Sequence, residues 1–270
     1  MKQKHAPLAP MLTWERLDPS YAPTALKVRA ERVDLLFSIL PLGILATFLL
    51  TVITAAGLWP GGERTALSLW VAYVVVVSVG RFVLYRAYRS RKPPPENAPV
   101  WERRLAFGAL LSGLGWGALS TVLFPERDLL LQMLALFTLG GVCTGAVGAF
   151  APSPLAFALF IGPSLVPMIA HILLLGGRTY TAMGAMLAIY FFVLLALFHQ
   201  FYRRMNEAFT MRFVNDEARS YITRQRDHFD ILQISLIDTW AATGAGAFVL
   251  SEHSLYTTEA WTRFLDRLTP

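Results

Sequence analysis

Charge and cysteine are scarce in this sequence. Only 16% of the 270 residues are charged, whereas 55% are hydrophobic and the mean hydropathy is +0.48. Cys143 is the single cysteine, so an internal disulfide framework is excluded. It has no neighbouring His or Cys, and we interpret it as a small packing residue. A composition this apolar and this weakly charged excludes an ordinary soluble domain of the same length. The sequence therefore predicts an integral membrane protein.

Six apolar runs are long enough to cross a membrane, whose hydrocarbon core of about 30 Å needs about 20 residues of helix. Most of the connections between them are short and contain proline, glycine or charge. We therefore expect an all-α polytopic protein whose six transmembrane helices form one domain over residues 35–201. The expected spans are residues 35–58, 67–86, 105–124, 129–150, 155–175 and 180–201.

Basic residues are clustered beside these runs rather than spread along one helix face, although the net charge is +6. This pattern favours membrane lipid over nucleic acid as the partner. The longest connection contains Arg86, Arg89, Arg91 and Lys92, followed by Arg103 and Arg104. By the positive-inside rule it faces the cytoplasm, together with the leader (residues 1–34) and the tail after residue 201.

Acidic residues are missing from all six spans. A carboxylate proton relay or cation site of the kind found in pumps is therefore not expected. Arg81 interrupts the second span, and its side chain is expected to reach toward the headgroups, with a buried pairing role as the alternative. We expect no metal site and no cofactor.

Two further intramembrane residues are candidates for sensing. Trp116 could line a cavity opened by the bends at Pro163 and Pro167, or it could simply pack between helices. His171 could bind a metal or haem or titrate near neutral pH, but it is more simply an interfacial residue. His199 is expected on the opposite side of the membrane, so the two histidines are not expected to form one site.

Small residues recur every fourth position on two neighbouring spans. Such rows allow helix backbones to approach closely in a membrane. We expect these rows to pack the third and fourth spans against each other. They consist of Ala109, Gly113 and Gly117 on the third span and of Gly141 and Gly145 on the fourth.

Residues 202–240 continue the sixth span with almost no glycine or proline. Apolar residues alternate there in steps of three and four, which is typical of a two-stranded parallel coiled coil. A homodimeric signalling linker is therefore expected, and an amphipathic helix that folds back on its own domain is the alternative. The seam consists of Met211, Val214, Ala218, Phe229, Leu232 and Leu236, and Phe209 lies near it.

The segment 241–270 has a different pattern. A glycine-rich break is followed by two short strands, expected at 246–250 and 255–258, and by a helix from about Glu259 with Thr258 as its N-cap. These elements are too few to bury a core, so we interpret them as the start of a further domain.

The membrane part resembles the N-terminal membrane-embedded sensory modules, of the MASE general type, of bacterial signalling proteins. The stretches that carry the resemblance are WERRLAFGALLSGLGWGALSTVLFP, from Trp101, and LQMLALFTLGGVCTGAVGAFAPSPLAFALFIGPSLVPMIAHILLL. The final GAFVLSEHSLYTTEAWTRFL is similar to the opening of a PAS domain. The resemblance implies a sensory input in the bacterial inner membrane, with both termini cytoplasmic and an unknown stimulus ligand. It would pass its signal to a cyclic-di-GMP (GGDEF or EAL) or histidine-kinase output.

No catalytic motif supports an enzyme within these residues. The Gly-Gly pairs at 61, 140 and 176 do not lead into a GGDEF-type loop, and P-loop, zinc-ligand and nucleophile motifs are missing. Any output reaction therefore belongs to residues outside this sequence. The alternative from another class is a small polytopic transporter or channel with a cytoplasmic tail.

Overall fold

The computed structural model describes residues 22–59, 63–125, 128–224 and 258–266. Within these ranges every regular element is a helix, as expected from the composition, and none is a strand. The chain divides into two compact units, residues 1–203 and 204–270. The first unit holds the apolar helices.

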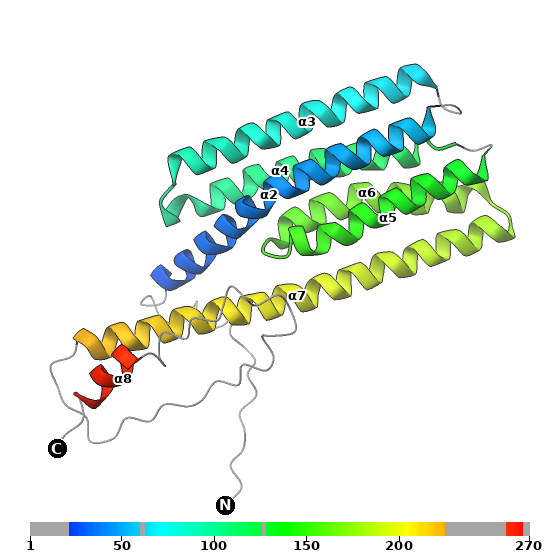
Figure 1. Cartoon of the computed structure of the whole chain (residues 1–270). Coiled ribbons are helices and arrows are strands. Elements are labelled where there is room, and N and C mark those ends of the chain that lie inside the picture. The colour runs from blue at the N-terminus through cyan, green and yellow to red at the C-terminus, as the bar shows by residue number, and fades with distance from the viewer. Residues whose placement is uncertain (1–21, 60–62, 126–127, 225–257, 267–270) are drawn as a thin grey trace, which may run out of the picture. The chain divides into compact units, whose positions relative to one another are not determined.

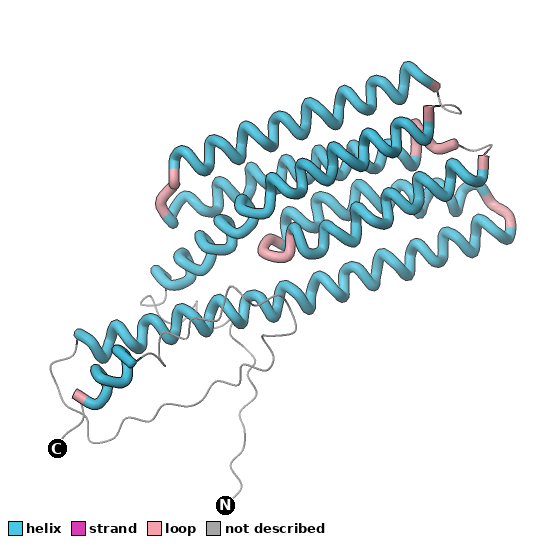
Figure 2. The backbone as a smooth tube through the Cα atoms, viewed as in Figure 1, coloured by secondary structure: helices cyan, strands magenta, loops and turns pink. Residues whose placement is uncertain are grey.

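Consecutive helices of the first unit run antiparallel (Figure 1), and short loops join most of them (Figure 2). The last of these helices, α7, continues into the second unit. The elements are α2 (Ala22–Leu58), α3 (Arg64–Arg91), the short 3₁₀ helix η2 (Pro95–Asn97), α4 (Ala98–Gly117), the 3₁₀ helix η3 (Ala118–Ser120), α5 (Leu129–Ala149), α6 (Pro154–Leu175) and α7 (Arg178–Arg224). Among consecutive helices, α2 and α3, α3 and α4, and α5 and α6 pack side by side.

Five of these helices, α2, α3, α5, α6 and α7, are long and apolar enough to cross a membrane. The expected third span differs, because α4 begins at Ala98 with three charged residues near its start and ends at Gly117 instead of continuing to residue 124. Its apolar part and η3 together measure about 25 Å, less than the core of about 30 Å. Glycines at 113, 115 and 117 have low helix propensity, which accounts for the early end.

The starts of α5 and α6 are capped by side chains that accept hydrogen bonds from free backbone N–H groups. The Asp128 carboxylate caps α5 by accepting from Leu130 N and Leu131 N. At the other end of the bundle α2 starts at Ala22, well before the expected residue 35, so the basic residues of the leader's last part lie on a helix.

The closest helix pair is α4 and α6, and glycine makes it possible. A Cβ atom on Gly113 would lie 2.5 Å from the Phe160 carbonyl oxygen, and one on Gly117 would meet the Pro163 carbonyl oxygen. Pro167 has no N–H with which to bond that Pro163 oxygen. Pro167 thus leaves the Pro163 carbonyl oxygen without its usual hydrogen bond within α6, at the point where Gly117 brings α4 closest.

This pairing corrects the partner expected from the sequence. The small-residue row of α4, which includes the fully buried Ala109, packs against α6 rather than against α5. A Cβ atom on Gly141 or Gly145 of α5 would meet nothing within 4 Å. The row on α5 therefore takes no part in this close contact.

Large side chains join the remaining helices. Phe37 stacks on Tyr88 with ring centroids 3.9 Å apart, and Trp101 packs edge-on against both rings, which ties α2, α3 and α4 together. The α7 backbone comes close to the other helices at few points. It is held by side chains such as Phe198, which stacks on Phe157 of α6 at 4.0 Å. α7 is therefore the most loosely packed helix of the described bundle.

The second unit contains the end of α7 and the short helix α8 (Thr258–Leu265). The helix expected from about Glu259 is thus confirmed. Met211, Val214 and Ala218 of the expected seam lie on α7. Phe229, Leu232 and Leu236 lie outside the residues that the structure describes, and so do the two expected strands except for Thr258. Thr258 is expected to end a strand and to be the N-cap of the helix, but it is the first residue of α8. The coiled coil and the PAS-like fold stay predictions.

Candidate functional site

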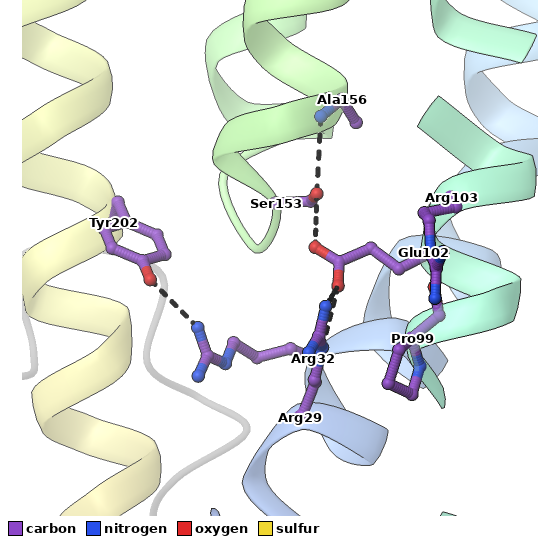
Figure 3. Close-up of polar contacts among 8 residues, drawn as sticks. All are labelled: Arg29, Arg32, Pro99, Glu102, Arg103, Ser153, Ala156 and Tyr202. Atoms are coloured by element: carbon purple, nitrogen blue, oxygen red, sulfur yellow. Dashed lines mark hydrogen bonds and ion pairs between the residues drawn. The ribbon is translucent and has the colours of Figure 1, made fainter. Parts of the chain in front are cut away.

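One end of the bundle gathers most of its charged side chains, and we call it the basic end. There α2 and α4 begin, α3 ends with Arg89 and Arg91 in its last turn, and α6 starts after the α5–α6 loop. Figure 3 shows polar side chains from α2, α4, α7 and the start of α6 meeting at this end. We call the five residues Arg29, Arg32, Glu102, Ser153 and Tyr202 the polar network.

Glu102 on α4 is the centre of this network. Its Oε2 accepts two hydrogen bonds from Arg29 on α2, at 2.9 Å from Nε and 2.8 Å from Nη2. The carboxylate side chain is 13% exposed and the Arg29 side chain 45% exposed. Because the arginine is largely solvated, the pair contributes at most about 1 kcal/mol to stability. The Arg29–Glu102 pair instead fixes the position at which α2 contacts α4.

The second carboxylate oxygen binds the start of α6. Ser153 Oγ donates a hydrogen bond of 2.7 Å to Glu102 Oε1, and the same hydroxyl oxygen accepts from the Ala156 backbone N–H at 3.3 Å. Ser153 is completely buried and is the N-cap of α6. One hydroxyl therefore closes the helix end and connects it to α4, and through Glu102 to α2.

The α7 helix joins the network at Tyr202. Arg32 Nη1 donates a hydrogen bond of 3.1 Å to the Tyr202 hydroxyl, and the guanidinium carbon lies 5.8 Å from the centre of the same ring. Arg32 Nε is buried and has no acceptor among the described residues. The phenol is thus held through both its hydroxyl and its face.

The polar network consists of two groups of contacts, and both include an arginine of α2. Arg29 and Arg32 are three residues apart on α2 and therefore lie on neighbouring positions of one helix face. Arg29 contacts Glu102 of α4, and Arg32 contacts Tyr202 of α7. A rotation or shift of α2 would change both contacts together, so the arrangement couples the packing of α4 and α6 to the position of α7.

Arg81, the first of the predicted sensing residues, does not extend into an exposed position at the basic end. It is only 8% exposed, and its Nη1 donates a hydrogen bond of 3.1 Å to Ser112 Oγ on α4. Its Cγ lies opposite Gly108, and Ser112 is one turn farther from the basic end, because α4 begins at that end and Ser112 follows Gly108 by four residues. The alternative, a buried pairing role, describes this side chain.

The other two sensing candidates lie elsewhere. Trp116 is 1% exposed and packs edge-on against Trp70 of α3 at 5.8 Å, so ordinary packing describes it. His171 lies near the far end of α6, with its ring 4.9 Å from that of Phe124. The structure does not bring Arg81, Trp116 and His171 together. Within the described ranges no three His, Cys, Asp or Glu residues are grouped closely enough to hold a metal ion.

Sequence reasoning missed the polar network. Arg29 and Arg32 belong to the leader (residues 1–34), which the sequence assigns only to the cytoplasmic side, and no role is predicted for Ser153. A usable signal was present in Glu102, an acid placed between Trp101 and two arginines in a basic segment. The partner of that acid could not be found without knowing that α2 extends back to Ala22.

No protein-family model, curated protein or solved structure matches this chain. The functional conclusion therefore depends on the chain's own residues and on the resemblance described above.

Proposed function

We propose that this chain is the membrane-embedded sensory input region of a bacterial signal-transduction protein. In this proposal a stimulus shifts α2 relative to the closely packed α4–α6 pair, and α7 carries the change to a cytoplasmic output, for cyclic-di-GMP turnover or histidine-kinase activity. Membrane lipid surrounds the bundle in the inner membrane. In this proposal α4 provides a sixth membrane crossing inside the bundle, which places both termini in the cytoplasm. The α7 helix pairs with α7 of a second copy of the chain.

The continuity of α7 supports this proposal most strongly. One uninterrupted helix runs from Arg178 to Arg224, across the boundary between the two units. An unbroken helix transmits a shift or rotation along its whole length. Tyr202 couples it to Arg32 near the end of the first unit, where a displacement would enter the second.

The packing of α7 also suits a moving element. Helix interfaces switch between discrete arrangements when side chains repack, whereas the α4–α6 pair, with glycine against backbone, has little room to shift. α7 has instead a short ladder of side-chain contacts with α5. The Tyr190 hydroxyl oxygen lies 2.7 Å from Thr144 Oγ1, and the same hydroxyl donates to the Gly140 carbonyl oxygen. The Tyr180 hydroxyl donates to Gln132 Oε1 at 3.4 Å.

The transporter alternative lacks a comparable observation. A transport pathway needs a continuous polar route past the buried groups of the bundle. The small cavity beside Arg81 has a volume of about 20 Å³ and is otherwise lined by apolar residues and a glycine, such as Leu36, Gly43 and Phe150. It could hold about one water molecule.

A fusion tests the proposal functionally. Residues 1–270 would be joined to a diguanylate cyclase catalytic domain of known activity and expressed in a bacterial membrane. The proposal predicts that Glu102→Gln and Tyr202→Phe change cyclase activity, while Arg86→Gln, an exposed charge change at the same end, does not. Equal activity in all four proteins, or solute flux in proteoliposomes above that of empty vesicles, would contradict it.

A further inference from the structure

A groove lined by residues of α3 and α4 lies between these two helices. The two helices run next to each other in Figure 1. Its volume is about 710 Å³, within the range of about 300–1,000 Å³ of sites that hold small molecules. Three arginines line it, Arg81, Arg103 and Arg104, and the rest of its lining is apolar or glycine. No carboxylate lines it.

Two glycines create the space. Gly80 of α3 has nothing within 4 Å of an added Cβ atom, so a side chain is simply missing there. Gly108 of α4 leaves room for Arg81, whose Cγ would lie 3.2 Å from a Cβ at that position. The arginine side chain is therefore laid along the floor of the groove instead of extending toward the basic end.

Arg81 needs more acceptors than the protein supplies. A guanidinium has five N–H donors, and within the described residues Arg81 donates one hydrogen bond, to Ser112 Oγ. The Ser112 hydroxyl donates in turn to the Gly108 carbonyl oxygen at 2.9 Å. Among the described residues no carboxylate pairs with Arg81. A charge buried at this depth in an apolar helix pair is expensive unless an acceptor reaches it.

The order of groups along the groove matches the order of groups in a phospholipid. Exposed Arg103 and Arg104 lie at its outer end, and the phosphate is the outer, polar part of a phospholipid. Gly108, opposite Arg81, follows Arg104 by about 6 Å along α4. The headgroup layer on each side of the hydrocarbon core is about 5–7 Å thick, so a lipid with its phosphate at Arg103 and Arg104 would have its glycerol ester carbonyls near Arg81. Val76, Val77 and Leu111 line the deeper, apolar end.

We propose that the α3–α4 groove binds one anionic phospholipid, with its phosphate on Arg103 and Arg104, an ester carbonyl on Arg81, and an acyl chain along the apolar end. Charge complementarity selects an anionic lipid over a zwitterionic one, because the lining offers three cations and no anion. This site is separate from the polar network, and its failure would leave the proposed relay untouched.

The binding test uses the full chain, delipidated in a neutral detergent and titrated with dioleoyl phosphatidylglycerol or dioleoyl phosphatidylcholine. Native mass spectrometry counts the one-lipid complex. We expect phosphatidylglycerol to bind at least about fivefold more tightly than phosphatidylcholine. This is the factor in affinity that one basic residue near an anionic lipid contributes. Inorganic phosphate and oleate, added separately, should displace it poorly.

Matched variants locate the site. Arg103→Gln with Arg104→Gln should abolish the preference, and Arg86→Gln with Arg89→Gln should keep it, because these exposed arginines of α3 do not line the groove. Val77→Trp should block the acyl chain without a charge change, whereas Val79→Trp, an exposed position outside the groove, should not. Arg81→Met should weaken binding of both lipids, since its carbonyl contact does not depend on headgroup charge.

Three results would overturn the proposal. The first is equal binding of the two lipids by the unaltered chain. The second is equal loss in the groove variants and their controls, which would indicate only general attraction to a basic surface. The third is loss of bound phosphatidylglycerol when inorganic phosphate or oleate is added at the concentration at which phosphatidylglycerol itself saturates the site. That result would show that no diacyl lipid is required. If Arg81→Met does not fold, the Arg103→Gln/Arg104→Gln and Val77→Trp variants and their controls still decide the question.

Discussion

Gly113 of α4 lies so close to Phe160 of α6 that one added methyl group would reach to 2.5 Å from the Phe160 carbonyl oxygen. Gly117 and Pro163 repeat this relationship one turn farther along both helices. The contact involves backbone on both sides, so it cannot be relieved by a change of rotamer.

Gly113→Ala and Gly117→Ala should each destabilise the bundle by about 1–3 kcal/mol, the usual cost of overpacking. Gly141→Ala and Gly145→Ala are the controls, because nothing lies within 4 Å of an added Cβ there and alanine has the higher helix propensity. Unfolding by SDS in mixed micelles measures all four variants. An equal loss of stability in both pairs would contradict the assigned contact.

Glu102→Gln should lower the free energy of unfolding by about 1 kcal/mol, because a charge-assisted acceptor of Arg29 and Ser153 becomes neutral. A double-mutant cycle with Arg29→Gln isolates the ion pair. The coupling energy should fall between about 0.1 M and 1 M salt, since the Debye length shortens from about 10 Å to about 3 Å. A coupling of zero at low salt would show that the two side chains act independently.

Ser153→Ala should cost about 1 kcal/mol as a lost N-cap of α6. If the Ser153 hydroxyl also connects α6 to Glu102, part of this cost disappears when Glu102 is already glutamine or alanine. Hydrogen exchange at the first turn of α6 gives the readout for the cap. If the stability losses of Ser153→Ala and Glu102→Ala are strictly additive, the Ser153 hydroxyl acts only as the N-cap of α6 and does not connect α6 to Glu102.

Removing both partners of the Arg81–Ser112 pair should be milder than removing one. Ser112→Ala leaves the buried guanidinium without its protein acceptor and should destabilise the chain by about 1–3 kcal/mol. Arg81→Met together with Ser112→Ala should recover most of this loss, because apolar side chains replace a buried polar pair. Thermal unfolding in zwitterionic detergent measures the series. A double variant less stable than Ser112→Ala would disprove this account of Arg81.

The dimeric linker can be tested by single cysteines introduced along residues 205–224 in a Cys143→Ala chain. Crosslinking between copies should peak at Met211, Val214 and Ala218, which follow steps of three and four. Arg212 and Asp216, on other faces of a helix, serve as controls. A flat profile, or none, would favour a helix that folds back on its own domain.

The sequence predicted the helices better than it predicted their partners. Apolar length and terminal punctuation placed α5 and α6 within a residue of their observed ends. Gly113 and Gly117 were recognised as a packing row, but a row of small residues does not name the helix that it faces. The sequence did not predict that α4 begins at Ala98, because its first turns are charged. Trp101 and Trp116 of α4 are buried by contacts with other helices, which a hydropathy pattern does not reveal.

The polar network could not be derived from the sequence for a similar reason. Arg29 and Glu102 are 73 positions apart, and Arg32 and Tyr202 are 170 apart. Each residue alone is typical of a membrane interface, where arginine and tyrosine are common. Only the antiparallel order of the helices brings their ends together.

The most direct test of the relay measures one distance between spin labels, placed at Arg89→Cys on α3 and Arg204→Cys on α7 in a Cys143→Ala chain. The labelled protein is diluted with unlabelled protein in lipid nanodiscs. Tyr202→Phe removes only the hydroxyl that Arg32 contacts and keeps the ring. We predict that Tyr202→Phe and Glu102→Gln both shift or broaden the distance distribution, while Arg86→Gln leaves it unchanged. Identical distributions in all four proteins would show that α7 is not coupled to the bundle through the polar network.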